Sequence, residues 1–305
     1  MSLAEDLHAP LRVLLSADSS PVANASLEEW LFRSPVTGPT LVLYRNARAV
    51  LCGRNQSLWL ECDPCTCVRE GITLMRRLSG GGTVYHDEGN LNVALIRPRH
   101  EHSHQAFTDL LAEALRELGL TDLAVDSHGS LLTGGRKLCG TAIALSGGAS
   151  LVHGCVLVRT ELTALERALR LPPTRCVEGH GVASRRMPVT RLADHLPTVT
   201  VEALAAAVLA TATRRWGEPA SLERVCPEED TRLATYAQRF AAPSWTHAGG
   251  GAASFTLRQT LTDGRAFAAS VADGTIVRAT LDDETLTDLS GQPLQRLATH
   301  AILLS

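Results

Sequence analysis

The chain has 305 residues, of which 45% are hydrophobic and 20% are charged, and its formal net charge is −3. This length suggests two domains and leaves ample material for a buried core. The near-neutral charge argues against a protein built mainly to bind nucleic acid or an anionic membrane. No apolar run is long enough to cross a bilayer.

The basic residues are almost all arginine. Of the 29, 28 are arginine, and Lys137 is the one lysine. A bias toward GC-rich codons explains the scarcity, since it replaces lysine by arginine wherever charge alone matters. A compact ammonium and a planar guanidinium differ in shape and chemistry. Lys137 is therefore a candidate for a specific role, and chance survival at a surface position is the alternative.

Eight cysteines are scattered along the chain, and the N-terminal residues 1–16 show neither a secretory signal nor the basic amphipathic character of a transit peptide. We therefore expect reduced thiols in a cytoplasmic protein. The cysteines are Cys52, Cys62, Cys65, Cys67, Cys139, Cys155, Cys176 and Cys226.

In chain order, apolar periodicity predicts strands and helices that do not alternate regularly, which favours an α+β domain over a doubly wound one. The runs 40–45 and 47–53 are expected to pair with each other. The other predicted strands are 11–15, 72–78, 83–96, 130–133, 137–145 and 151–158, and the predicted helices are 24–32, 104–119, 160–171 and 200–216.

The apolar periodicity is weak over residues 225–247. Beyond it, runs of alternating apolar and polar residues surround the Asp-Gly pairs 263–264 and 273–274. Asp-Gly between alternating runs is a good signal for a β-hairpin. With a predicted helix at 291–303, this segment indicates a small α+β domain. We expect a catalytic domain over 1–240 and an accessory domain over 241–305.

The segment Arg76 to Asp87, RRLSGGGTVYHD, carries three consecutive glycines between two predicted strands. Glycines there cost backbone entropy, and they suit a main chain that approaches a ligand and points N–H groups at it. The expected ligand is a phosphate or a carboxylate, and Arg76 and Arg77 could add charge-assisted hydrogen bonds to it. A flexible turn is the alternative.

A second segment, GGRKLCGTA, places Lys137 just after a Gly-Gly turn and at the start of a strand, and VHG follows at 152–154. A lysine entering a strand there can direct its ammonium into a cleft. The alternative is that Lys137 is a solvated surface charge, as most lysines are.

These two segments resemble the signature blocks of the lipoate–protein ligase A family, within the biotin and lipoate protein ligase superfamily. The likeness extends to NASLEEW, GRNQSLWLEC and GVASRRMPVTRLADHLP, and to the C-terminal domain with Trp245, so it spans nearly the whole chain. The resemblance implies an α+β catalytic domain like that of biotin ligases and class II aminoacyl-tRNA synthetases, with a small α+β C-terminal accessory domain.

The resemblance also implies a reaction. Family members activate lipoate or octanoate with ATP and Mg²⁺ to the acyl adenylate. They then transfer the acyl group to a lysine on the lipoyl domain of a 2-oxoacid dehydrogenase E2 subunit or on the glycine-cleavage H protein. Nucleic acid and membrane are not expected partners, and a monomer is expected.

By the same resemblance Lys137 is the catalytic lysine, which contacts the acyl carbonyl and the α-phosphate. No residue is assigned to a metal. The implied nucleotide- and acyl-binding positions are Arg77, Ser79, Gly80, Gly81, Gly82, Thr83, Val84, Tyr85, His86, Lys137, His153 and Gly154.

One position departs from the family pattern, because Gly129 stands where members usually carry an aspartate eight residues before the lysine. This keeps open a lipoyltransferase that uses preformed lipoyl-AMP, and an inactive acyl- or nucleotide-binding relative. A cysteine-dependent octanoyltransferase would need Cys176 as its nucleophile.

Other groups carry simpler expectations. Three cysteines at 62–67 fall short of a structural zinc pattern, so buried thiols are favoured over a metal site. The histidines at 100–104 are expected in a solvated loop. His86 and Asp87 are also expected to make a structural hydrogen bond that supports the glycine loop.

Overall fold

The computed structural model describes residues 10–249 and 254–304. The chain forms two compact units, each made of discontinuous segments. The first unit contains Met1–Asn46, Glu88–Thr160 and Met187–Leu233, and the second contains Ala47–Asp87, Glu161–Arg186 and Ala234–Ser305. The expected division into a catalytic domain over 1–240 and an accessory domain over 241–305 stays a prediction.

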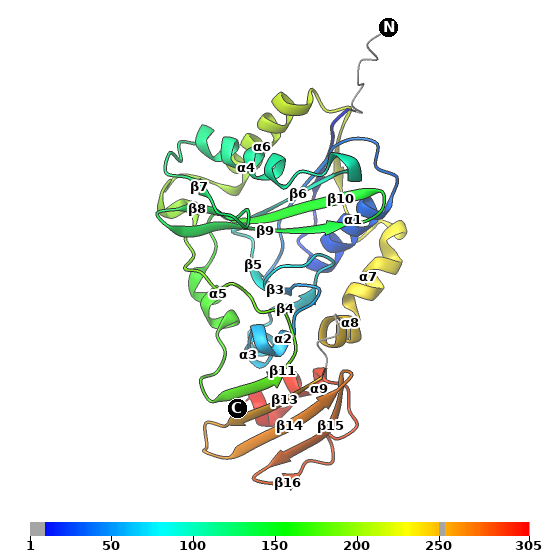
Figure 1. Ribbon diagram of the computed structural model, residues 1–305, viewed down its shortest axis with the longest axis vertical. Coiled ribbons are helices and arrows are strands. Elements are labelled where there is room, and N and C mark those ends of the chain that lie inside the picture. The colour runs from blue at the N-terminus through cyan, green and yellow to red at the C-terminus, as the bar shows by residue number, and fades with distance from the viewer. Residues whose placement is uncertain (1–9, 250–253, 305) are drawn as a thin grey trace. The chain divides into compact units, whose positions relative to one another are not determined.

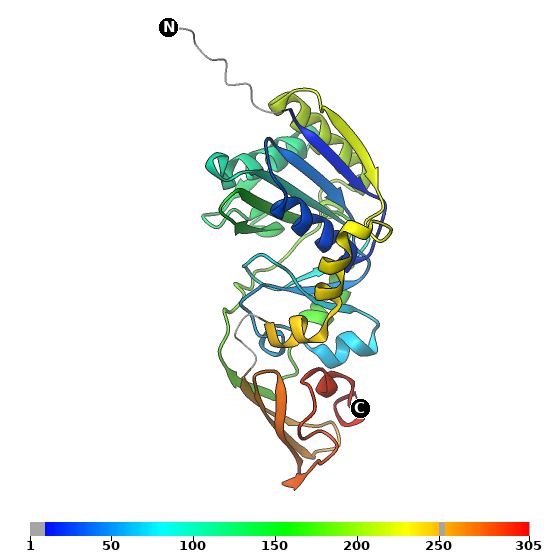
Figure 2. The same cartoon turned by 90° about the vertical axis from the view of Figure 1, so that its right-hand side faces the viewer.

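Eight of the described strands form one mixed sheet in the first unit, in the order β12-β1-β2-β6-β10-β9-β8-β7. Antiparallel pairing joins its central strands, and β1 pairs in parallel with β12 and β2 at one edge (Figure 2). The strands are β1 Arg12–Ser16, β2 Thr40–Tyr44, β6 Asn90–Pro98, β7 Ala124–Val125, β8 Leu131–Thr133, β9 Arg136–Leu145, β10 Ala149–Leu157 and β12 Ser221–Val225.

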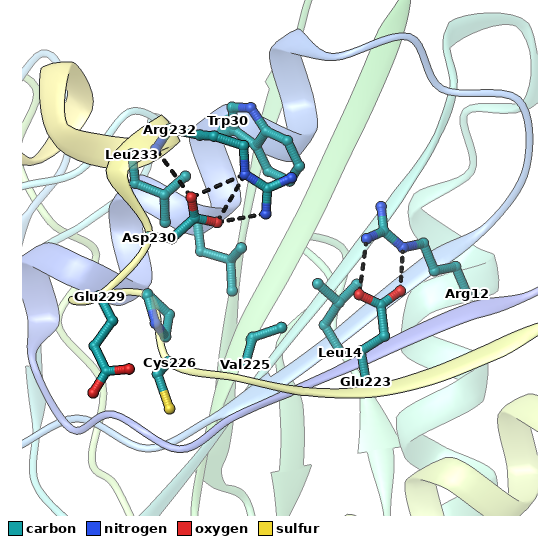
Figure 3. A pocket seen from close by; sticks show the side chains of 12 residues that line it. Arg12, Leu14, Trp30, Glu223, Val225, Cys226, Glu229, Asp230, Arg232 and Leu233 are labelled. Carbon is teal, nitrogen blue, oxygen red and sulfur yellow. Dashed lines mark hydrogen bonds and ion pairs between the residues drawn. The ribbon is translucent and has the colours of Figure 1, made fainter.

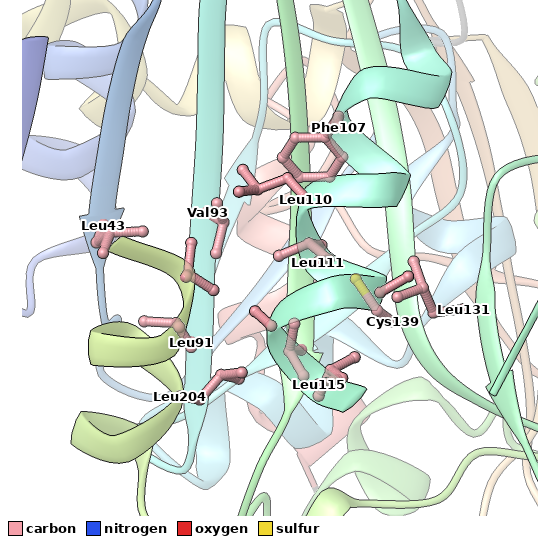
Figure 4. Close-up of a cluster of buried hydrophobic side chains, with 14 of the residues drawn as sticks. Leu43, Leu91, Val93, Phe107, Leu110, Leu111, Leu115, Leu131, Cys139 and Leu204 are labelled. Atoms are coloured by element: carbon pink, nitrogen blue, oxygen red, sulfur yellow. The ribbon is translucent and has the colours of Figure 1, made fainter. Parts of the chain in front are cut away.

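The helices α4 (His104–Glu117) and α6 (Val201–Trp216) cover one face of this sheet (Figure 1). Their apolar side chains pack with alternate residues of the central strands in a buried core, and Leu91, Val93 and Leu111 lie within it (Figure 4). Burial of this apolar surface is the main force that holds helices and sheet together.

The helix α1 (Pro21–Arg33) packs on the opposite face, where Glu28 meets side chains of the sheet. It begins at Ser20, whose hydroxyl accepts a hydrogen bond from the N–H of Ala23, and proline at the first position suits a helix start. Ser103 caps α4 in the same way. These caps position both helices on the sheet.

The second unit contains a three-stranded sheet in the order β4-β3-β5 and a five-stranded sheet in the order β11-β13-β14-β15-β16. The strands are β3 Ala49–Cys52, β4 Thr73–Arg76, β5 Val84–His86, β11 Arg175–Gly179, β13 Phe255–Thr260, β14 Ala266–Ala272, β15 Thr275–Leu281 and β16 Glu284–Thr285. The helices are α2 Leu58–Glu61, α3 Pro64–Arg69, α5 Leu162–Leu169, α7 Ala234–Ala241, α8 Pro243–Ala248, α9 Gln295–Thr299 and α10 Ala301–Leu304.

A separate apolar core lies in the second unit, where Trp59 of α2 packs among side chains of the five-stranded sheet. The ring centroids of Trp59 and Phe255 are 6.3 Å apart. The hairpins predicted around the two Asp-Gly pairs are confirmed as β13–β14 and β14–β15. The α+β class is confirmed as well.

One predicted pairing is wrong. The run 40–45 does not pair with 47–53, because Thr40–Tyr44 lies between β1 and β6 in the large sheet, whereas Ala49–Cys52 pairs with β4 and β5 in the second unit. The two strands were expected to pair because they follow each other closely, but the chain passes from one unit to the other between them. Among the described residues, no helix has the length and apolar character needed to span a membrane.

Candidate functional site

Lys137 stands near the start of β9, and its main chain is held on both sides by the segment that follows residue 187. Its N–H donates to the carbonyl of Pro188 at 2.9 Å, and its carbonyl accepts from the N–H of Thr190 at 3.0 Å. The side chain turns over Gly140, where an added Cβ would lie 3.0 Å from Nζ and 2.9 Å from Cε. Glycine at 140 therefore leaves the space that the ammonium occupies.

The Lys137 ammonium makes no hydrogen bond or ion pair with any residue in the described ranges 10–249 and 254–304. A half-buried cation without a protein counter-ion can serve an anionic ligand, because it has no carboxylate to release first. This fits the part that the resemblance implies for the lysine.

His153 of β10 is held by a carboxylate from α1. Its Nδ1 lies 2.9 Å from Oε2 and 3.1 Å from Oε1 of Glu28, and the Tyr44 hydroxyl donates to Oε1 of Glu28 at 2.8 Å. The Glu28 side chain is only 7% exposed. A buried carboxylate with two such partners orients the imidazole on this face of the sheet.

Gly154 faces the other side of the sheet from His153. An added Cβ at Gly154 would lie 3.0 Å from Sγ of Cys139 and 3.1 Å from the ring of Phe107, both of which belong to the core under α4. Packing thus requires a small residue at 154. The acyl-binding part implied for Gly154 stays a prediction.

The glycine block lies in the second unit and is organised around Arg77. Its guanidinium donates to Oγ of Ser79 (2.9 Å) and to the carbonyls of Leu51 (3.1 Å), Gly80 (2.5 Å) and Gly82 (2.8 Å). Arg77 is buried. It therefore folds the loop by gathering carbonyl oxygens on one side.

The main-chain N–H groups of Gly80, Gly81 and Gly82 donate to no described residue. Gly81 has a φ of +85°, which glycine adopts without strain. Successive N–H groups in such a turn form a concave anion-binding surface. The loop therefore has donors available for a phosphate or a carboxylate, as the sequence predicts.

Ser184 holds the loop from the segment after β11. Its hydroxyl accepts from the N–H of Thr83 at 2.9 Å and from Nε2 of Gln56 at 3.0 Å, and it makes a short hydrogen bond to the Glu61 carboxylate. The N–H of Ser184 donates to the same carboxylate at 3.0 Å. An added Cβ at Gly82 would lie 2.9 Å from this hydroxyl, so Gly82 and Ser184 fit each other closely.

Arg76 is fully buried, and its hydrogen bonds go to main-chain carbonyls of the protein. Its guanidinium donates to the carbonyls of Gly53, Arg54, Gln56, Trp245 and Thr246 at 2.7–3.0 Å. Burial lowers the pKa of Arg76. These carbonyls join residues 53–56 to α8, so Arg76 works as a structural cross-link in this unit.

The end of the glycine block is largely buried. The Tyr85 hydroxyl accepts from Nε of Arg48 at 3.3 Å, and burial raises the pKa of Tyr85. Asp87 accepts from the N–H of Glu161 at 2.9 Å and so anchors the start of α5. His86 is buried on β5 opposite Ala49, and Val84 pairs with Leu51.

Gly129 lies in a turn with a φ of +76°, and an added Cβ would lie 2.0 Å from Cε1 of the His104 ring. Nε2 of His104 is 2.9 Å from Oγ1 of Thr141, and burial lowers the pKa of His104. A carboxylate side chain at 129 therefore does not fit while His104 occupies this place. His104 itself begins α4, so it does not belong to the expected solvated loop.

The cysteines show no metal site. Within the described ranges, no group of three or more histidine, cysteine, aspartate or glutamate residues is arranged to hold a metal ion. Cys62, Cys65 and Cys67 are buried and free, and burial raises the pKa of Cys65 to about 11. Cys176 is exposed on β11 opposite Arg258.

A pocket of about 270 Å³ lies between α1 and the strands β1 and β12 (Figure 3). Two arginines line it, and both are paired, Arg12 with Glu223 at 3.1 Å and Arg232 with Asp230 at 2.6 Å. None of the residues predicted for the site lines this pocket. The predicted site therefore does not lie there.

Three partners of the predicted residues were missed from the sequence, namely Glu28, Gln56 and Ser184. All three lie inside sequence blocks that carry the resemblance, NASLEEW, GRNQSLWLEC and GVASRRMPVTRLADHLP. That membership was an available signal. Glu28 stands 125 residues from His153, and Gln56 and Ser184 stand 27 and 101 residues from Thr83, so only the fold brings these pairs together.

Comparison with known proteins places these features in context. A family model described as the lipoyl protein ligase A/B catalytic domain matches residues 20–213. Among solved structures, LipL1 of P. falciparum in complex with lipoate is 18% identical with a TM-score of 0.68, and the match covers 96% of this chain and 89% of that one.

Two further structures are similar in fold. A bi-partite lipoate protein ligase from Thermoplasma acidophilum, studied with its E2 lipoyl domain, is 23% identical with a TM-score of 0.64, over 79% of this chain and 97% of that one. A lipoate-protein ligase A bound with ATP is 24% identical with a TM-score of 0.63, over 78% of this chain and 98% of that one.

Proposed function

The chain belongs to the lipoyl protein ligase A/B catalytic domain family, and from this premise we propose that it is an ATP-dependent lipoate–protein ligase. It activates lipoate with ATP to lipoyl-AMP and then transfers the lipoyl group to a lysine of an acceptor protein. Structures of the same fold hold lipoate in one case and ATP in another, which supports both substrates.

The observation that carries the proposal is the Lys137 ammonium, which stands over Gly140 without a protein counter-ion among the described residues. Both half-reactions build negative charge between a carbonyl oxygen and a phosphate oxygen. A fixed cation placed there stabilises the transition state more than the ground state. Lys137 is the residue proposed for this task in both steps.

The glycine block supplies the second set of donors. The N–H groups of Gly80, Gly81 and Gly82 are proposed to bind an anionic group of the substrates, and Arg77 and Ser184 keep the loop in the shape that exposes them. The remaining implied contacts, from Ser79, Thr83, Val84, Tyr85, His86, His153 and Gly154, are part of the same proposal.

Mg²⁺ enters the proposal with ATP. Magnesium usually keeps water ligands and binds through nucleotide phosphates with few protein carboxylates. We assign it no residue and no step.

The proposed acceptor is a lipoyl domain of a 2-oxoacid dehydrogenase or the glycine-cleavage H protein. The T. acidophilum ligase of the same fold was studied with its E2 lipoyl domain, which supports the first of these. We propose a monomer that acts in the cytoplasm.

The test uses two parallel reactions. In the first, the protein is incubated with lipoate, ATP, Mg²⁺ and apo-H protein or an apo lipoyl domain, and lipoylation is read by intact mass. In the second, synthetic lipoyl-AMP replaces lipoate and ATP. Lipoylation in both reactions supports the ligase, and lipoylation in neither, with a folded protein, would contradict it and leave an inactive relative.

A lipoyltransferase that uses preformed lipoyl-AMP is the second candidate, and one observation favours it. The His104 ring fills the place of any side chain at Gly129, so the carboxylate usual in the family is absent at that position. Lipoylation in the second reaction alone would establish this candidate. A cysteine-dependent octanoyltransferase would instead require octanoyl carrier protein as donor and lose activity in Cys176→Ser.

A further inference from the structure

Asn92 of β6 has a buried amide group that lacks a partner. The residue is 2% exposed, and its Nδ2 makes no hydrogen bond with any described residue. A buried donor left without a partner costs free energy, so such groups are rare in native proteins and call for an explanation. A ligand that brings an acceptor is one explanation, and a water molecule is another.

Strand alternation and register place Asn92 on the α1 face of the large sheet. Leu91 and Val93 point into the core under α4 and α6, so Asn92 points to the other face. On that face the register forms a row across four strands, Tyr44, Asn92, Cys155 and Gly140.

The two ends of this row carry the polar groups already described. The Lys137 ammonium lies over Gly140, and Tyr44 donates to Glu28. Asn92 therefore stands on the face that carries the Lys137 cation, which the proposed function places at the carboxyl end of the acyl substrate. Its amide is two strands away from that cation.

The distance between Gly140 and Asn92 matches the length of lipoate. Two strand separations make roughly 10 Å between Gly140 and Asn92. In lipoate, four methylene groups separate the carboxyl carbon from the dithiolane ring, a reach of roughly 6–7 Å with ordinary bond lengths. With a hydrogen bond of about 3 Å at each end, a carboxylate at Lys137 brings a ring sulfur within reach of Asn92.

We propose that Asn92 determines acyl specificity by donating a hydrogen bond from Nδ2 to a dithiolane sulfur, so that the enzyme prefers lipoate to octanoate. Sulfur is a weak acceptor, but an alkyl chain offers none and leaves the buried amide unpaired. A site built to hydrogen-bond a substrate group rejects the analogue that lacks it for this reason. The inference rests on the proposed function, because it takes Lys137 as the carboxylate-binding end.

The experiment compares the wild type with Asn92→Leu and Asn92→Ala. Thr211→Val serves as the control, because it removes a buried hydroxyl on α6, away from the α1 face. ATP-dependent kcat/KM is measured for lipoate and octanoate, and the Kd of each free acid is measured by calorimetry without ATP. A ratio of the two acids is unaffected by partial unfolding, which lowers both values equally.

We expect the lipoate-to-octanoate ratio to fall about tenfold in both Asn92 variants and to stay constant in Thr211→Val. An unchanged ratio in the Asn92 variants would overturn the inference and assign the amide to water. Equal Kd values for the two acids in the wild type, or no binding of either, would overturn it as well. Selective binding without turnover would overturn only the proposed function, while the binding ratio would still support Asn92.

Discussion

Lys137 occupies a place that suits an ammonium and does not suit a guanidinium. Its Cε and Nζ lie close to Gly140, 2.9 Å and 3.0 Å from the position that an added Cβ would take. A guanidinium is planar and broader, and its donors project as a fork. The chain has arginine at 28 of its 29 basic positions. The exception, Lys137, lies at a position where the shape of the cationic group matters as well as its charge.

Lys137→Arg is accordingly expected to lower kcat/KM for lipoyl-AMP formation about 10²–10³-fold, although it conserves charge. The fork misplaces the donor relative to the developing negative charge. Pyrophosphate release with lipoate and ATP measures this step. The neighbouring exchange Arg136→Lys, at an exposed position, is the control and should keep near-normal activity. Near-normal activity of Lys137→Arg would remove the lysine from the mechanism.

His247 in α8 makes stability depend on pH. Burial, with a smaller effect from the Arg76 charge, lowers the pKa of His247 from 6.5 to about 4. The folded chain therefore keeps His247 neutral where the unfolded chain takes up a proton. Its contribution is fully present above about pH 6.5 and is lost as the pH falls toward 4.

The shift corresponds to about 3 kcal/mol lost between pH 7 and pH 4. Urea unfolding at several pH values should show this decline in the wild type and a shallower one in His247→Gln. His180→Gln changes an exposed histidine and should follow the wild type. Parallel pH profiles for wild type and His247→Gln would show that the folded protein protonates this residue without cost.

At the scale of elements, the glycine loop is shaped by close main-chain packing and by buried polar side chains. The carbonyls of Gly80 and Gly82 face Arg77, while the N–H of Thr83 is held by Ser184. Gly53 lies against the loop from the strand β3 side, where an added Cβ would be 2.1 Å from the carbonyl oxygen of Gly81. The loop therefore needs glycine at some positions for space and at others for its φ.

Two glycines of this region allow a matched comparison. Gly53→Ala is expected to destabilise the protein by about 1–3 kcal/mol, because main chain cannot move aside as a side chain can. Gly80→Ala meets nothing within 4 Å and should change stability by less than about 0.5 kcal/mol. The free energy of unfolding in urea measures both. Equal effects would show that the loop rearranges freely around residue 53.

At the scale of the whole molecule, each unit has its own apolar core, one under α4 and α6 and the other around Trp59 and the five-stranded sheet. Leu111 is fully buried in the first core, whereas Leu222 on the edge strand β12 is 55% exposed. Stability is therefore expected to depend on position within each unit and not on residue type alone.

Leu111→Ala should lower the free energy of unfolding by about 2–5 kcal/mol, because it leaves a cavity in a close-packed core. Leu222→Ala removes the same atoms from a mostly exposed site and should change the free energy of unfolding by less than about 0.5 kcal/mol. The denaturant midpoint and its slope, measured together, separate a change in stability from a change in the unfolded state. A small effect of Leu111→Ala would indicate that this core collapses around the gap.

The amino-acid sequence was enough to locate many of the local elements and the blocks of residues that carry chemistry. Periodicity located α4, α6 and the hairpins of the C-terminal sheet, because helices and hairpins follow from neighbouring residues. The single lysine and the glycine run are visible in the same way. Their resemblance to the blocks of one family is enough to make Lys137 the candidate catalytic residue.

Contacts between residues that are distant in the sequence became visible in the three-dimensional fold. The strands 40–44 and 49–52 belong to different sheets, Glu28 holds His153 across 125 residues, and Gly129 is explained by the ring of His104. Arg76 and Arg77 look alike in the sequence, yet the structure buries both and directs them at different carbonyls. The physical reason is that long-range pairing depends on which surfaces bury one another, and residue spacing carries no record of that.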